Sequence, residues 1–90
     1  MTPEAAFGQV LRELRQNAGL SQEKLAEAID CTRPYISYLE NGQYSATISM
    51  VFRLADALGL SAAELITRAE ALADEPSAQV TRPRLRRGER

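Results

Sequence analysis

The sequence has no histidine and a single cysteine among its 90 residues. Without histidine, the Ser-His-Asp and Cys-His catalytic groups and every histidine-ligated metal site are excluded. The lone Cys31 cannot form an intrachain disulfide, so the fold does not depend on an oxidising compartment. No run of hydrophobic residues is longer than three, which indicates neither a membrane span nor a signal peptide. We therefore expect no enzyme, no metal or other cofactor, and no membrane protein.

Basic charge is scarce over most of the chain. Residues 1–73 carry six basic and nine acidic side chains, a net charge of −3, whereas residues 74–90 carry five arginines and three acids, a net charge of +2. An acidic body does not attract nucleic acid through its overall charge. Only a local basic or dipolar surface could bind it.

Capping residues and apolar spacing predict five helices and no strand. Each expected helix begins at a hydroxyl residue suited to an N-cap: Thr2, Ser21, Thr32, Thr47 and Ser61. The last of these opens a Ser-x-x-Glu capping box with Glu64. Apolar residues then recur at helical spacing, and on the fourth helix they predict this inner face: Ile48, Val51, Leu54, Ala55 and Leu58.

The expected fold is therefore one all-α domain of five helices over residues 1–73. Its second helix spans about 21–29 and its third about 32–41. Residues 74–90 show no apolar period and five arginines, which predicts a basic, flexible tail that adds non-specific affinity for a nucleic-acid backbone. An alternative is that this tail begins a linker to a C-terminal effector domain.

Residues 20–42, LSQEKLAEAIDCTRPYISYLENG, resemble the helix-turn-helix of Cro and the phage repressors, the family often called XRE. The resemblance runs from Leu11 to Leu65. It includes Gly-Leu-Ser-Gln before Leu-Ala, Ile-Ser before Leu-Glu-Asn-Gly, and a later Leu-Ala-Asp-Ala-Leu-Gly-Leu. It implies a lambda-repressor-like fold whose third helix enters the DNA major groove, where each base pair presents its own pattern of donors and acceptors.

The resemblance also implies which residues meet DNA. Base contacts are expected from the third helix and its cap: Thr32, Arg33, Pro34, Ser37 and Tyr38. Phosphate contacts are expected around it: Ser21, Gln22, Tyr35, Asn41, Tyr44 and Ser45. Arg33 is the strongest candidate for a base contact, because arginine donates two parallel hydrogen bonds to guanine O6 and N7. The residues alone leave other roles open, namely an ordinary first-turn Gln22, a solvated Arg33, and tyrosines that pack within the domain.

Two further sets of residues are assigned to structure. Arg15 and Glu40 match an ion pair that joins the first and third helices in the family, while Arg12 is expected to be solvated. The apolar stripe of the fifth helix exceeds what a terminal helix needs and predicts a homodimer interface: Leu65, Ile66, Ala69 and Leu72. Such pairing would place two third helices about 34 Å apart, one turn of DNA. The alternative is that this stripe only closes the core of the monomer.

The sequence thus predicts a transcriptional regulator, a dimeric repressor or controller, that binds a double-stranded DNA operator. We expect a cytoplasmic, nucleoid-associated protein of bacterial or phage origin with no small-molecule ligand. The alternative is a protein-interaction module on the same fold, for example one that binds a partner protein as an antitoxin does, with weak or no DNA binding.

Overall fold

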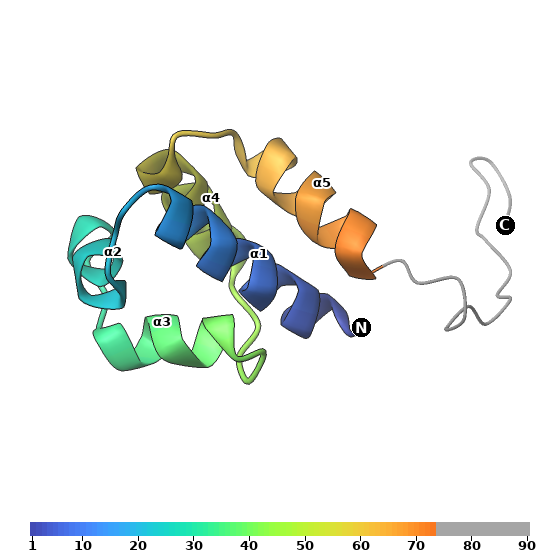
Figure 1. Cartoon of the computed structure of the whole chain (residues 1–90), viewed down its shortest axis with the longest axis horizontal. Helices are drawn as coiled ribbons and strands as arrows, with labels where there is room; N and C mark the ends of the chain where they lie inside the picture. The colour runs from blue at the N-terminus through green and yellow to red at the C-terminus, as the bar shows by residue number, and fades with distance from the viewer. Residues whose placement is uncertain (74–90) are drawn as a thin grey trace, which may run out of the picture.

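The structure, a computed structural model, describes residues 1–73, which form five α-helices and no strand (Figure 1). The helices are α1 (Pro3–Asn17), α2 (Gln22–Ala28), α3 (Arg33–Glu40), α4 (Ile48–Leu58) and α5 (Ala62–Ala73). The expected five-helix, all-α fold is confirmed. The expected tail, residues 74–90, lies outside the described residues.

Hydroxyl side chains begin the helices as the sequence predicts. The side chains of four of them accept a hydrogen bond from the backbone N–H three residues later: Thr2, Ser21, Thr32 and Thr47. At α5, Ser61 Oγ accepts from the Glu64 N–H at 3.0 Å and Glu64 Oε1 accepts from the Ser61 N–H at 2.9 Å. The N-cap residues stand outside the regular helices, so α2 and α3 are each slightly shorter than the ranges 21–29 and 32–41.

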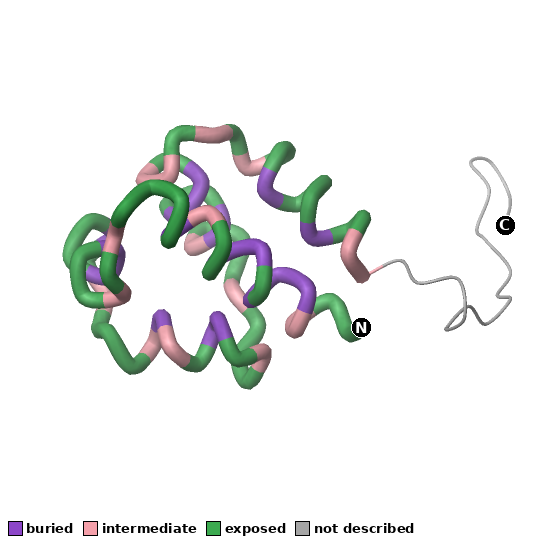
Figure 2. The backbone as a smooth tube through the Cα atoms, viewed as in Figure 1, coloured by how far each residue is buried: buried purple, intermediate pink, exposed green. Residues whose placement is uncertain are grey.

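The helix α1 is the centre of the fold. It packs against α3 on one side and α5 on the other, while α2 packs on α3 and α4 on α5 (Figures 1 and 2). Every helix contributes to one core, whose largest fully buried side chains are Leu11, Leu25, Ile36, Leu39, Leu54 and Leu65. Burial of each such side chain contributes about 1.5–3 kcal/mol, so α1 fixes the positions of α3 and α5 through shared apolar contacts.

The inner face predicted for α4 is wrong at its first residue. Val51, Leu54 and Ala55 are buried and Leu58 is half-buried, but Ile48 is 75% exposed. Ile48 lies on the predicted stripe, yet no helix of the described residues 1–73 covers it, and it borders an open hollow instead. Helical spacing identifies the apolar face of a helix but not how much of that face a neighbour covers.

A glycine within α1 allows the close crossing of α1 and α3. A methyl group built at Gly8 would lie 2.6 Å from the carbonyl oxygen of Glu40 and 2.8 Å from its carbonyl carbon. Backbone atoms cannot rotate away as a flexible side chain can. Gly8 therefore sets how near the end of α3 comes to α1.

We predict that Gly8→Ala destabilises the fold. Alanine favours a helix interior by about 1 kcal/mol over glycine, but forcing the two helices apart costs about 1–3 kcal/mol or more. Urea unfolding followed by circular dichroism should give a lower free energy of unfolding than the wild type. Gln16→Ala, on the exposed side of the same helix, should change it by less than about 0.5 kcal/mol. An unchanged or raised stability for Gly8→Ala would contradict the tight crossing.

Candidate nucleic-acid interface

A short, fixed turn connects α2 to α3. Asp30 takes a positive φ of 59°, a conformation that few residues other than glycine adopt, and the Cys31 N–H donates to the Ala26 carbonyl at 2.9 Å. Arg53 from α4 donates through Nη1 to the Ile29 carbonyl at 3.3 Å. These bonds satisfy the end of α2 and hold α3 at one angle to it, with Thr32 capping the new helix.

The outer face of α3 collects the residues predicted to contact bases. Ile36 and Leu39 point into the core and are fully buried. On the opposite face, four of the five residues predicted to contact bases are exposed: Thr32, Arg33, Pro34 and Tyr38. The fifth, Ser37, is half-buried. The structure thus brings the five together on one surface of one helix.

Three tyrosines hold the loop after α3 against the helix. The ring of Tyr44 lies 4.8 Å from that of Tyr38 and 6.0 Å from that of Tyr35, centroid to centroid, in tilted arrangements. Burial raises the pKa of the Tyr35 hydroxyl, with a smaller contribution from Cys31, so this hydroxyl stays protonated and able to donate. Ser45, exposed beside Tyr44, is presented on the same loop.

The carboxylate of Glu40 joins three helices. Its side chain is fully buried. Arg15 on α1 donates to it through Nε at 2.5 Å and Nη2 at 3.1 Å, and Gln22 on α2 donates through Nε2 at 3.0 Å. Arg15 Nη1 also donates to the Leu20 carbonyl at 2.7 Å. The structure therefore brings together the predicted pair Arg15 and Glu40. The bond from Gln22 also ties the start of α2 to the end of α3.

Sequence reasoning missed three contacts around this cluster, two made by Arg12 and one between Arg33 and Gln22. Arg12, expected to be solvated, donates to Glu40 Oε1 at 3.4 Å and to Asn41 Oδ1 at 3.0 Å. Gln22 also accepts from Arg33 Nη1 at 3.2 Å. The spacing of Arg12 and Arg15 at i and i+3 places both on one helical face, which is the signal that could have indicated a shared partner.

Comparisons with known proteins agree with this geometry. A family model described as helix-turn-helix matches residues 11–65. The chain belongs to this helix-turn-helix family. It is 46% identical over 50 residues to an uncharacterised HTH-type transcriptional regulator of Methanothermobacter thermautotrophicus, covering 56% of this chain and 72% of that protein.

Two solved structures of regulators share the helix-turn-helix fold. The restriction-modification controller protein C.AhdI from Aeromonas hydrophila superposes with a TM-score of 0.66 at 43% identity, covering 68% of this chain and 92% of that one. The clp gene regulator ClgR from C. glutamicum superposes with a TM-score of 0.77 at 28% identity, covering 82% and 95%.

The residues assigned to a dimer interface of this helix-turn-helix protein do not share one surface. Leu65 is fully buried and Ala69 is 7% exposed, both within the core, because α5 turns them toward α1. Their assignment to an interface is corrected. Ile66 is exposed and Leu72 is half-buried, so these two retain surface that a second molecule could cover.

Within residues 1–73, no group of three or more Cys, Asp or Glu side chains is placed to hold a metal ion, and no helix is long and apolar enough to cross a membrane. Burial and the neighbouring Asp30 raise the pKa of the Cys31 thiol. A reactive cysteine requires the opposite shift.

The pKa of Glu40 reports how strongly the cluster is held. Burial alone would raise it, but the hydrogen bonds and charge of Arg15, together with the bonds from Gln22 and Arg12, lower the pKa below its ordinary value. The donors thus outweigh the desolvation of the carboxylate.

We predict that Glu40→Gln reduces stability most at neutral pH. A lowered folded-state pKa contributes stability that is present above the ordinary glutamate range, about 4.3, and is lost as the pH falls through the folded-state value. The variant should lose about 1–3 kcal/mol at pH 7, and the difference from the wild type should shrink on acidification below about pH 4. Urea unfolding at several pH values measures it.

The comparison variant for this experiment is Glu64→Gln. Backbone and side-chain hydrogen bonds from Ser61 lower the pKa of Glu64 as well, but this carboxylate is exposed and bonds only within its own cap. At pH 7, Glu64→Gln should lower the free energy of unfolding less than Glu40→Gln does. A stability difference for Glu40→Gln that stays constant from pH 7 to pH 3 would contradict a buried, ionised Glu40.

Proposed function

We propose that this DNA-binding transcriptional regulator acts as a homodimeric repressor or controller that reads a double-stranded operator with α3 in the major groove. The observation that carries the proposal is the exposed outer face of α3, held in one orientation by the buried Glu40 cluster. A helix of this kind fits the major groove of B-form DNA. The protein would act in the cytoplasm, at the nucleoid, and the proposal includes no catalysis.

Base readout is assigned to the outer face of α3. Arg33, at the first position of the helix, carries the donor fork that fits guanine O6 and N7. The hydroxyls of Thr32 and Ser37 are short and reach only nearby groups. Pro34 and the ring of Tyr38 offer apolar surface to a thymine methyl.

Phosphate contacts are assigned to residues around the exposed face of α3. Ser21 and Gln22 lie at the start of α2, Tyr35 lies on α3 itself, and three more residues follow it: Asn41, Tyr44 and Ser45. All six side chains are uncharged, so they would position the protein through hydrogen bonds. Such contacts fix register on the duplex and carry no direct sequence information.

We predict that Arg33→Ala removes a base preference. On the selected operator it should cost about 1–3 kcal/mol and relax the preference at one position of each half-site. The measurement is a binding panel over all single-base variants of a half-site at fixed salt, after selection of the operator from a random library. Uniform weakening with every preference intact would make Arg33 a backbone contact instead.

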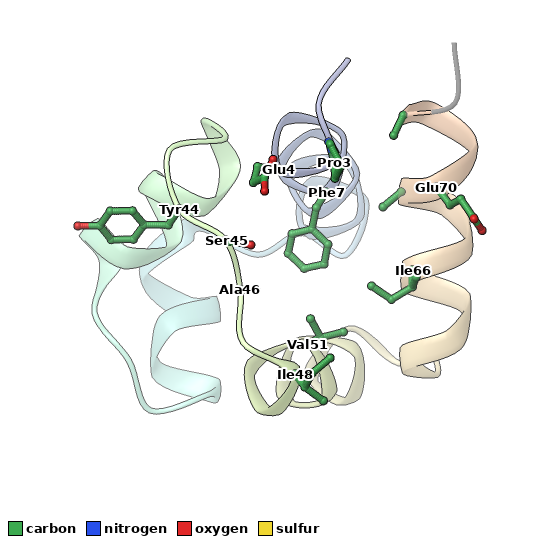
Figure 3. Close-up of a pocket in the computed structure, with 12 residues that line it drawn as sticks. Pro3, Glu4, Phe7, Tyr44, Ser45, Ala46, Ile48, Val51, Ile66 and Glu70 are labelled. Carbon is green, nitrogen blue, oxygen red and sulfur yellow. The ribbon is translucent and has the colours of Figure 1, made fainter. Parts of the chain in front are cut away.

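An apolar hollow bordered by α1, α4 and α5 supports the homodimer. Figure 3 shows Phe7, Val51 and Ile66 around it, with Ile48 at its edge. Ile48 is 75%, Phe52 63% and Ile66 45% exposed. Exposed apolar surface of this kind is typical of an interaction site, and a second copy related by a two-fold axis would cover the same surface on both molecules.

We predict that Ile66→Lys dissociates the dimer without unfolding it. A charge brought into an apolar contact is costly, but position 66 is outside the monomer core. Sedimentation should give a monomer, with helical circular dichroism unchanged. Thr67→Lys, exposed on the next position of α5, should stay dimeric. A wild-type protein that is already monomeric at tens of micromolar would exclude this interface.

A second candidate is a protein-interaction module on the same fold. Residues 1–73 carry a net charge of −3, and residues 43–46 contain no lysine or arginine, so bulk attraction to DNA is weak. Salt-dependent binding to one operator but not to random DNA favours the regulator. Binding to neither, with a stable protein complex instead, favours the module.

A further inference from the structure

Arg12 uses only one edge of its guanidinium within the domain. Its Nε donates to Glu40 Oε1 at 3.4 Å, and its Nη2 donates to Asn41 Oδ1 at 3.0 Å. The other edge, formed by Nη1 and the second N–H of Nη2, makes no hydrogen bond to the described residues 1–73. The Arg12 side chain is 45% exposed. It therefore retains two parallel donors for a ligand.

The ion pair with Glu40 does not account for the charge of Arg12. Glu40 already accepts from Arg15 through Nε at 2.5 Å and Nη2 at 3.1 Å, and from Gln22 at 3.0 Å. One carboxylate thus meets two arginines, which leaves one positive charge in excess. The excess lies on Arg12, because its contact is the longest and its side chain is 45% exposed against 11% for Arg15.

The neighbours of Arg12 indicate which anion it would bind. Arg12 shares Glu40 Oε1 with Gln22 and donates directly to Asn41, so it lies between two residues assigned to phosphate contacts. Because Arg12 occupies the oxygen of the Asn41 amide, the amide NH₂ group is left to donate. Its bond to Ser37 Oγ is long, at 3.5 Å. A phosphate here would meet donors from two side chains, and the fork of an arginine fits phosphate with two parallel hydrogen bonds.

We propose that Arg12 is a charged contact to the DNA backbone, where α1 meets the end of α3, with the Asn41 amide as the second donor to the same phosphate. The inference deepens the proposed function and rests on it. The six phosphate contacts assigned above are uncharged, so Arg12 would supply the neutralising charge that they lack. Such a contact strengthens binding to every sequence and makes the affinity dependent on salt.

The first test measures the salt dependence of binding by Arg12→Gln. Each phosphate neutralised contributes about 0.9 to the slope of log affinity against log salt, so the slope should fall by about 0.9 per protomer and about 1.8 for a dimer. The advantage of the wild type over the variant should shrink about tenfold between about 50 and 200 mM salt. Base preferences over the half-site panel should stay intact.

The matched control is Arg68→Gln, which removes one positive charge from an exposed position of α5. Its salt slope should equal that of the wild type, because its effect on DNA binding is limited to the change in net charge. Urea unfolding is the second control. Arg15 and Gln22 still pair Glu40 in Arg12→Gln, so the urea midpoint should fall less than in Glu40→Gln.

The second test locates the phosphate. Single phosphates of the selected operator are replaced in turn by a neutral methylphosphonate. At one position per half-site, this replacement should weaken the wild type several-fold but leave Arg12→Gln unaffected. Arg12→Lys keeps the charge but not the two parallel donors, so it should lose less than the wild type at that same position. This variant also serves if Arg12→Gln does not fold.

Three results would overturn the inference. One is an unchanged salt slope in Arg12→Gln, and another is an equal fall in Arg68→Gln. The third is a methylphosphonate scan in which the wild type and both Arg12 variants lose the same affinity at every position. In each case the wild type still binds its operator, so the proposed function stands. A wild type that binds no DNA would instead overturn the proposed function, and this inference with it.

Discussion

The arrangement of the first three helices depends on one buried carboxylate, that of Glu40. Burial of a charge costs several kcal/mol unless donors compensate it, and here Arg15, Gln22 and Arg12 supply them from two other helices. Within residues 1–73, no buried side-chain nitrogen or oxygen lacks a hydrogen-bond partner. A slip of either helix by one residue would take donors away from the carboxylate, so the cluster favours one relative orientation of α1, α2 and α3 over its alternatives.

That cluster forms only because α1 and α3 approach closely. Gly8 lies where the backbone of α3 crosses α1, and Arg12 and Arg15 follow one and two turns later on the same helix. The absence of a side chain at Gly8 is what brings the end of α3 within reach of both arginines. Packing at the crossing and hydrogen bonding at Glu40 are therefore parts of one constraint, and the orientation of the exposed face of α3 follows from it.

Local signals predicted where the helices begin, whereas the burial of individual apolar residues depended on how the helices pack in space. The caps at Ser21 and Thr32 and the capping box at Ser61 depend on neighbours within three residues, and the structure has them as expected. Ile48 and Leu65 both lie on apolar stripes, but one is exposed and the other fully buried. Spacing alone could not separate them because coverage depends on where another helix ends.

At the polar site, too, features within one helix could be predicted, whereas contacts between helices could not. The five expected base-contact positions share a face because they occupy one helix and its cap, which periodicity determines. The bond from Gln22 to Arg33 depends instead on the angle between α2 and α3, and that of Arg12 to Asn41 on the crossing of α1 and α3. No local pattern specifies these angles, so neither bond could be read from the sequence.

The distribution of charge gives the proposed interface a particular character. Arg12, Arg15 and Arg33 lie within one hydrogen-bonded cluster with a single acid, Glu40, although residues 1–73 carry a net charge of −3. Long-range attraction is weak for an acidic body, since it depends on the summed field. Short-range contacts are not weakened in this way, because salt screens charges beyond about 10 Å and hydrogen bonds act well inside that distance. Such a domain gains little binding free energy from long-range attraction to DNA and more from short-range contacts with a matching sequence. In the proposed interface, uncharged phosphate contacts would serve discrimination between sequences more than affinity for DNA in general.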